Sequence, residues 1–210
     1  MEKLVLADIK SLFAVLKEVM ISNREKLIEL DGIMGDGDLG LTMVTAFSVA
    51  AEEIPPEEQD LGKVFVKMGM AMAKAAPSTM GTLMGTGFMR GGKAVKEKTE
   101  LGLAEMAQFW RAFVAGLMER GKTGPGDKTI IDSLDPAAAA LEKAAAENKT
   151  LAEGFADANA AAEAGMENTR TMAAQVGRLA YNQEKSKTII DPGSVVGHLV
   201  IKTFADYIAK

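Results

Sequence analysis

The chain contains no cysteine and only one histidine among its 210 residues. The absence of cysteine excludes a disulfide framework and thiol chemistry, and it favours a reducing cytoplasm as the simplest setting. No apolar run is long enough to cross a bilayer, and the first residues lack the basic region and the long apolar core of a signal peptide. The net charge of −5 argues against nucleic acid or an anionic membrane as the main partner. We therefore expect a cytoplasmic protein that binds neither nucleic acid nor membranes.

Strand patterns are also missing, because helical periodicity covers almost the whole chain. Apolar residues recur at helical spacing from residue 4 to residue 20 and again from 64 to 72, and the Ala-rich runs suit close-packed helices. A chain of this length without an internal repeat or linker fits one domain, residues 1–210. We predict an all-α fold with a first helix that includes residues 4–20 and further helices at about 22–30, 40–54, 60–75, 81–97, 102–120, 130–147, 151–180 and 193–209.

Carboxylates and glycines concentrate between Leu30 and Thr42, a segment that contains Asp31, Asp36, Asp38 and four glycines. Carboxylate oxygens are the hard ligands that Mg²⁺ selects, and a protein-bound Mg²⁺ usually leaves its other positions to water and substrate phosphates. The glycines allow sharp turns and the close approach of a ligand. The segment therefore predicts a metal site that holds phosphate, and a solvated turn rich in Asp and Gly is the alternative.

Three better-known motifs partly match this sequence, and each fails a physical test. Gly35–Gly40 spells the dinucleotide-binding fingerprint, but a helical pattern precedes it and its two carboxylates would repel a bare pyrophosphate. A calcium loop that starts at Asp36 would need glycine where Leu41 stands and glutamate where Phe47 stands. Gly87–Ala94 nearly spells a P-loop, but its last residue lacks the hydroxyl that would bind Mg²⁺. Phosphate binding through a metal remains the better interpretation.

Three further polar loops each precede a helical pattern: Pro77–Thr82, Gly121–Thr129 and Asp191–Ser194. Their hydroxyls and backbone amides suit an anion at a helix N-terminus. Alone, each loop is an ordinary helix entry capped by Ser, Thr or Asp. Together with the Asp-rich segment, they favour a nucleotide site in a helical domain. His198 lies in an apolar run, so we expect a structural histidine rather than a catalytic one.

In their order along the chain, these motifs resemble those of the DhaL/Dak2 domain family. This family comprises the nucleotide-binding L subunits of dihydroxyacetone kinases and the equivalent C-terminal domain of single-chain dihydroxyacetone kinases. The resemblance runs almost end to end, and it is more specific than the Asp-rich segment alone. It is carried by Leu30-Asp31, Gly35-Asp36-Gly37-Asp38, Gly40, Gly81, Gly85-Thr86, Arg120-Gly121-Lys122, Pro125-Gly126-Asp127-Lys128-Thr129, Asp132, Gly177-Arg178, Ala180-Tyr181 and Asp191-Pro192-Gly193.

The resemblance implies a closed barrel or bundle of about eight antiparallel helices with the nucleotide site at one end. Asp31, Asp36 and Asp38 would hold two Mg²⁺ ions on the phosphates of ADP or ATP. No catalytic residue is implied beyond these metal ligands, except that Arg178 is a candidate. The nucleotide pocket would be lined by Leu39, Gly40, Leu41, Thr42, Thr79, Met80, Gly121, Ile130, Arg178, Asp191, Pro192 and Gly193.

By the same resemblance, the chain would be a kinase subunit in which positioning and charge neutralisation drive phosphoryl transfer. The phosphoryl group would pass from the bound nucleotide to dihydroxyacetone on a separate K subunit, and the chain would be inactive without that partner. A separate L chain further resembles the phosphotransferase-system arrangement, in which a DhaM-type subunit rephosphorylates bound ADP, and a homodimer is compatible with it. Two alternatives stay open: an ATP-dependent L subunit for another small ketose such as a tetrulose, and an ADP-loaded regulatory interaction protein.

Two positions depart from the family pattern. The family usually has histidine after the third aspartate and asparagine three residues later, whereas this chain has Leu39 and Thr42. Thr42 keeps a hydroxyl that can donate a hydrogen bond to phosphate, but Leu39 offers only an apolar side chain. We therefore expect the bound nucleotide to lose one polar contact relative to histidine-bearing members.

Overall fold

The computed structural model describes all residues, 1–210, and its regular structure is almost entirely helical. The α-helices are α1 (Leu6–Ser22), α2 (Arg24–Gly32), α3 (Leu39–Glu52), α4 (Leu61–Ala75), α5 (Thr79–Ala94), α6 (Leu103–Gly121), α7 (Ile131–Ala146), α8 (Leu151–Asn168), α9 (Gln183–Ser186) and α10 (Pro192–Ile208). Two 3₁₀ helices lie between α8 and α9, η1 (Thr169–Thr171) and η2 (Arg178–Asn182), and the strands β1 (Leu4–Val5) and β2 (Glu100–Leu101) form one antiparallel pair.

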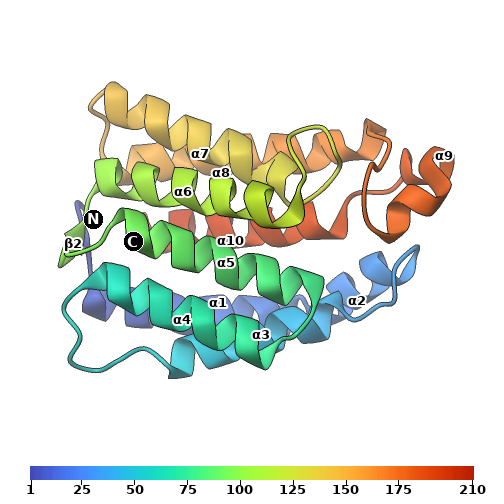
Figure 1. Cartoon of the computed structure of the whole chain (residues 1–210). Coiled ribbons are helices and arrows are strands. Elements are labelled where there is room, and N and C mark those ends of the chain that lie inside the picture. Colours follow the sequence, from blue (N-terminus) through green and yellow to red (C-terminus); the bar gives the residue numbers. More distant parts are fainter.

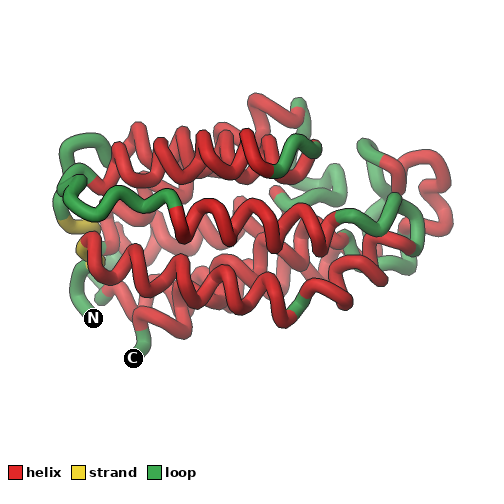
Figure 2. Tube along the Cα trace, turned by 90° about the horizontal axis from the view of Figure 1, so that it is seen from below, coloured by secondary structure: helices red, strands yellow, loops and turns green.

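Eight long helices run alternately up and down around a common core and close into a barrel (Figure 1). α1 packs on α3, and each helix from α3 to α7 packs on the helix that follows it. α8 packs on α10, and α10 packs on α1, which closes the ring. The short α2 extends beyond the end of α1 and packs on α3. Seen from below, the helices lie side by side and the loops gather at the two ends (Figure 2). The predicted all-α barrel of antiparallel helices is therefore confirmed.

Aromatic side chains fill the inside of the barrel. The ring centroid of Phe88 on α5 lies 5.4 Å from that of Phe13 on α1 and 5.1 Å from that of Phe113 on α6, both in edge-to-face geometry. All three side chains are fully buried. Because large apolar rings occupy the middle of the barrel, the ends are the parts left for a ligand.

Two glycines allow α4 and α5 to lie very close together. A Cβ built on Gly69 would lie 2.5 Å from the carbonyl oxygen of Gly85, and a Cβ built on Gly85 would lie 2.5 Å from that of Gly69. No larger residue fits at either position unless the backbone shifts. The contact therefore sets where α5 lies on α4, and with it the position of the polar loop that begins α5.

The helix that the sequence predicts over 151–180 is wrong in its second half. α8 ends at Asn168 and passes into the 3₁₀ helix η1, after which Met172 is extended. Oγ1 of Thr169 accepts a hydrogen bond from the amide of Asp191 at 3.0 Å. Gly177, with a φ of 69°, then turns the chain again. The residues beyond α8 therefore leave the barrel wall instead of extending it.

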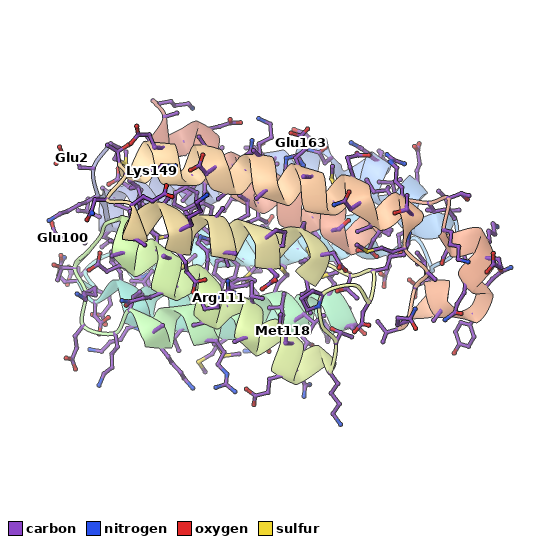
Figure 3. All side chains as sticks on the ribbon, turned by 90° about the horizontal axis from the view of Figure 1, so that it is seen from above. Glu2, Glu100, Arg111, Met118, Lys149 and Glu163 are labelled. Atoms are coloured by element: carbon purple, nitrogen blue, oxygen red, sulfur yellow. The ribbon has the colours of Figure 1, made fainter.

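The two ends of the barrel differ. Both termini and the strand pair lie at one end, where Figure 3 also shows Glu2 and Glu100, and α2 and α9 lie at the other end (Figures 1 and 3). The strand pair joins Leu4 to Leu101, and its strands are too short to leave a pattern in the sequence. None of the helices combines the length and the apolar character that a membrane span requires.

Candidate functional site

A cavity of about 1030 Å³ lies where the loops before α3, α5, α7 and α10 meet, at the barrel end that carries α2 and α9. These are the four loops that the sequence indicates, and they come from distant parts of the chain. The volume exceeds what a small metabolite needs and suits a nucleotide-sized ligand. The wall includes Asp31, Asp36, Asp38, Leu39, Ser78, Thr79, Met80, Leu83, Leu117, Arg120, Gly121, Thr123, Lys128, Thr129, Ile130, Ile131, Val176, Arg178, Asp191, Pro192 and Gly193.

Three carboxylates converge on one side of the cavity. Asp31 lies in the last turn of α2, and its Oδ2 accepts hydrogen bonds from the amides of Asp38 at 3.1 Å and Leu39 at 3.4 Å. One carboxylate oxygen each from Asp31, Asp36 and Asp38 lies within 4.8 Å of the other two. Gly35 permits this arrangement, because a Cβ there would lie 2.3 Å from Oδ1 of Asp31. The loop thus brings three hard oxygen ligands to one point.

The three carboxylates repel one another. Burial raises the pKa of Asp38 above its usual value, and the negative charges of Asp36 and Asp31 raise it further. The nearby guanidinium of Arg178 acts in the opposite direction. A divalent cation among the carboxylates would relieve this repulsion, and an all-oxygen donor set is the one that Mg²⁺ prefers. The residues present therefore fit a Mg²⁺ site.

Arg178 reaches the same carboxylates from the first residue of η2, far along the chain. Its Nη2 lies 2.5 Å from Oδ2 of Asp36, and both side chains are largely exposed. A guanidinium is permanently charged and presents several donors in a plane, which suits phosphate oxygens. The mouth of the cavity therefore combines metal-binding carboxylates with a cation that can contact phosphate.

The N-termini of two helices face the same cavity. Ser78 caps α5 by accepting a hydrogen bond from the amide three residues later at 3.1 Å, and Asp191 caps α10 in the same way at 2.6 Å. The other amides of a first helical turn have no partner within the helix. Thr79 and Gly193 lie in these first turns and line the cavity. Both helices thus direct partial positive charge towards a bound anion.

The loop before α7 is organised by Asp132, to which the sequence analysis assigned no role. Oδ1 of Asp132 accepts a hydrogen bond from the amide of Gly126, and Oδ2 accepts one from the amide of Thr129, both at 2.6 Å. These bonds fold the loop back on the first turn of α7, so that Thr129 and Ile130 line the cavity. The sequence signal that could have indicated this role is an aspartate in the first turn of a predicted helix.

Two buried charged side chains also line the cavity. Lys128 is 2% exposed, and its Nζ donates hydrogen bonds to the carbonyl oxygens of Thr169 and Ile189. Burial lowers the pKa of Lys128, and burial raises the pKa of Asp191 to about 7. The sequence does not indicate a role for Lys128 in the site, because a lysine in a polar loop normally points into solvent. Only the tertiary contacts show that it is enclosed.

Apolar side chains form another part of the cavity wall. Met80, Leu83 and Leu117 come from α5 and α6, and Ile130 adds a further apolar side chain from the loop before α7. The same cavity is also lined by carboxylates, an arginine and helix N-termini. Such a combination suits a ligand that has an apolar ring system at one end and phosphate groups at the other.

Most of the residues that the resemblance assigns to the site line this cavity: Asp31, Asp36, Asp38, Leu39, Thr79, Met80, Gly121, Ile130, Arg178, Asp191, Pro192 and Gly193. Gly40, Leu41 and Thr42 lie outside its wall, because α3 begins at Leu39 and the next residues turn away from the cavity. Gly40 packs against the backbone of Arg24, and Leu41 is 53% exposed. His198 also lies outside the cavity wall, on α10, with a buried Nε2 that has no hydrogen-bond partner.

Similar sequences are known. The family model of the DAK2 domain matches residues 33–206. The chain is 33% identical over 178 residues to the ADP-binding subunit DhaL of the PEP-dependent dihydroxyacetone kinase of Escherichia coli (strain K12), covering 84% of this chain and 85% of that subunit. It is 32% identical over 173 residues to the ADP-binding subunit DhaL of the PEP-dependent dihydroxyacetone kinase 1 of Listeria innocua, covering 82% of this chain and 81% of that subunit.

A similar fold occurs in the dihydroxyacetone kinase of C. freundii. Its native crystal structure matches 95% of this chain with a TM-score of 0.74 and 24% identity. Its complex with AMP-PNP and Mg²⁺ matches 94% with a TM-score of 0.68 and 24% identity. This chain covers 34% and 33% of those longer chains, so the likeness is one of fold within a part of that enzyme. On the family model and the relatives together, the chain belongs to the DAK2 domain family.

Proposed function

We propose that this chain is an ADP/ATP- and Mg²⁺-binding L subunit of a dihydroxyacetone kinase. As such, it transfers a phosphoryl group from the bound nucleotide to dihydroxyacetone held on a separate K subunit, and it is inactive without that partner. The observation that carries the proposal is the meeting of three carboxylates and Arg178 at the mouth of one large cavity. The two DhaL relatives, which are ADP-binding subunits, support it.

In this function, residues 1–210 would form one domain, and its nucleotide site would have an apolar part for the base and ribose and a polar part for the phosphates. One continuous hydrophobic core includes residues from α1 to α10, which supports a single domain. The apolar wall of Met80, Leu83 and Leu117 would contact the base and ribose. The first turns of α5 and α10 would donate backbone amides to the phosphates.

Phosphoryl transfer depends on charge neutralisation and positioning more than on covalent chemistry by the protein. Asp31, Asp36 and Asp38 would hold two Mg²⁺ ions, which when bound neutralise phosphate charge and orient the group to be transferred. Arg178 would place a further positive charge where negative charge develops on that group. The acceptor hydroxyl would be that of dihydroxyacetone held on the K subunit, which would dock against the open end of the cavity.

We further propose a DhaM-type subunit as the phosphoryl donor, because both relatives belong to PEP-dependent kinases. The alternatives are free ATP as donor with a tetrulose as acceptor, and an ADP-loaded regulatory role. A homodimer and a cytoplasmic location stay predictions from the sequence.

Calorimetry of Mg²⁺–ADP binding tests the metal site directly. Asp36→Asn should weaken binding several-fold or more, because one carboxylate is removed from the metal site while the phosphate charges stay. Glu29→Gln is the matched control, because Glu29 is an exposed carboxylate on α2 outside the cavity wall. Equal Mg²⁺–ADP affinity in Asp36→Asn and the native chain would overturn the metal assignment.

Reconstitution distinguishes the proposed dihydroxyacetone kinase subunit from the two alternatives, an ATP-dependent subunit for another ketose and a regulatory protein. The purified chain is combined with the K subunit of a DhaL relative, then supplied with either a phosphoenolpyruvate-driven DhaM system or ATP, and with either dihydroxyacetone or a tetrulose. Turnover of dihydroxyacetone that requires the K subunit and the DhaM system supports the proposal. Turnover with ATP alone favours the ketose alternative, and Mg²⁺–ADP binding without any turnover favours the regulatory one.

A further inference from the structure

The Arg178 segment, defined here as residues 170–188, leaves the barrel after α8 and returns at α10. It contains η2 and α9, and it stands apart from the long helices at the barrel end (Figure 1). The middle of the segment is joined to the Asp-rich loop by the exposed ion pair between Arg178 and Asp36. Exposed ion pairs contribute little to holding a loop in one geometry. The position of Arg178 therefore depends on bonds within the segment, such as that from the amide of Ala174 to Oγ of Ser186 at 3.0 Å, and on how the base of the segment is held.

One buried lysine joins the two ends of this segment. Nζ of Lys128 donates a hydrogen bond to the carbonyl oxygen of Thr169, directly before the segment, and another, at 2.5 Å, to that of Ile189, directly after it. The side chain is 2% exposed. The backbone of Lys128 has a φ of 62°, a left-handed conformation that residues with a side chain rarely adopt. The loop before α7 is thus shaped to direct this ammonium group inwards.

Two further bonds lie at the base of the segment. The amide of Gln175 in the segment donates to the carbonyl oxygen of Asp127 in the loop before α7 at 3.2 Å, and the amide of Asp191 donates to Oγ1 of Thr169 at 3.0 Å, which joins the residues that flank the segment. Lys128 is the charged member of this set, and a charged donor in a buried setting forms the stronger hydrogen bonds. Its loss would leave two carbonyl oxygens without this donor at the base of the segment.

We infer that Lys128 is a positioning residue that holds together the base of the Arg178 segment and thereby keeps Arg178 over the carboxylate of Asp36. The inference rests on the proposed function, in which Arg178 acts on the transferred phosphoryl group. Joining the two ends of a segment reduces the conformations open to its middle. Two of the three N–H donors of Lys128 are held by the carbonyl oxygens of Thr169 and Ile189, and the inference is that Lys128 acts through Arg178 rather than on the phosphoryl group.

Limited proteolysis tests the inference without any need for turnover. Arg178, Lys185 and Lys187 are exposed trypsin sites within the segment. In Lys128→Met, cleavage at these sites should be at least ten-fold faster than in the native chain, while cleavage in the barrel stays slow. Lys122→Met is the matched control, because Lys122 lies in the same loop, is exposed and also has a positive φ of 53°. It should leave the cleavage rate unchanged.

Kinetics with the K partner test whether Lys128 acts through Arg178. Lys128→Met should lower kcat at least ten-fold and change the affinity for Mg²⁺–ADP by less than about three-fold, since the carboxylates are untouched. In the Arg178→Met background, Lys128→Met should lower kcat little further, because two residues that act through one effect are not additive. A fully additive loss in the double variant would overturn the inference.

Other outcomes are equally decisive. Unchanged trypsin cleavage in Lys128→Met together with a large loss of Mg²⁺–ADP affinity would show that Lys128 contacts the nucleotide instead. If Lys128→Met does not fold, Lys128→Gln keeps two N–H donors on a shorter side chain, and it should show intermediate cleavage. If the native chain shows no turnover with any K subunit, the proposed function fails, and the proteolysis result still decides whether Lys128 holds the segment.

Discussion

Arg178, in the segment after α8, and Asp36, in the loop before α3, form an ion pair with an Nη2–Oδ2 distance of 2.5 Å, although 142 positions separate them in the chain. The same Asp36 belongs to the carboxylate cluster with Asp31 and Asp38. Both partners are exposed, so the pair can open without leaving a buried charge unpaired. Asp36 can thus serve a cation while Arg178 turns to phosphate.

We predict that Leu39→His slows the release of ADP. Leu39 is the first residue of α3, is 6% exposed and lines the cavity beside the carboxylate cluster. A histidine at this position could donate a hydrogen bond to phosphate, and a hydrogen bond to a charged group contributes roughly 1.5–3 kcal/mol, or about ten- to a hundred-fold in affinity.

The measurement for Leu39→His is the release rate of labelled ADP in Mg²⁺ buffer. Leu41→His is the control, because Leu41 lies two residues later on the same helix but is exposed and outside the cavity wall. Equal release from Leu39→His and the native chain would mean that the apolar side chain at this position does not weaken nucleotide retention.

Asp191 should give the folded protein a distinct pH dependence. Burial raises its pKa from 3.8 to about 7, so the folded state binds the proton more tightly than the unfolded chain does. Stability should therefore fall as the pH rises through this window, by a few kcal/mol at most, because an ionised carboxylate must stay buried.

The variant Asp191→Asn isolates this contribution, since asparagine also caps helices well. Urea unfolding of both proteins between pH 4 and pH 8 should show that the stability of Asp191→Asn relative to the native chain increases with pH. A constant difference across this range would mean that Asp191 titrates normally.

Gly85→Ala should destabilise the barrel by about 1–3 kcal/mol. The added Cβ would lie 2.5 Å from the carbonyl oxygen of Gly69, so α5 must move away from α4. Gly32→Ala is the control, because a Cβ on Gly32 meets nothing within 4 Å. The free energy of unfolding from urea titration measures both, and a loss in Gly85→Ala no larger than in Gly32→Ala would contradict this account of the contact.

The helices and the loops between them could be predicted from the sequence alone. Most of the predicted bounds agree with the structure to within a few residues, because amphipathic periodicity and polar helix entries are local signals. The prediction fails after Asn168, where the side chain of Thr169 accepts a hydrogen bond from the amide of Asp191, 22 positions later in the chain. No local pattern reports a bond to a residue that follows so much later in the chain.

The sequence by itself determined that the fold is helical and that three aspartates lie in one glycine-rich segment before a helix. These properties follow from side chains within a few positions of one another. Only the tertiary structure decided that Arg178 reaches Asp36 and that Lys128 is enclosed. Both depend on how the barrel closes and brings distant loops to one end, where contacts between residues far apart in the chain replace local preference.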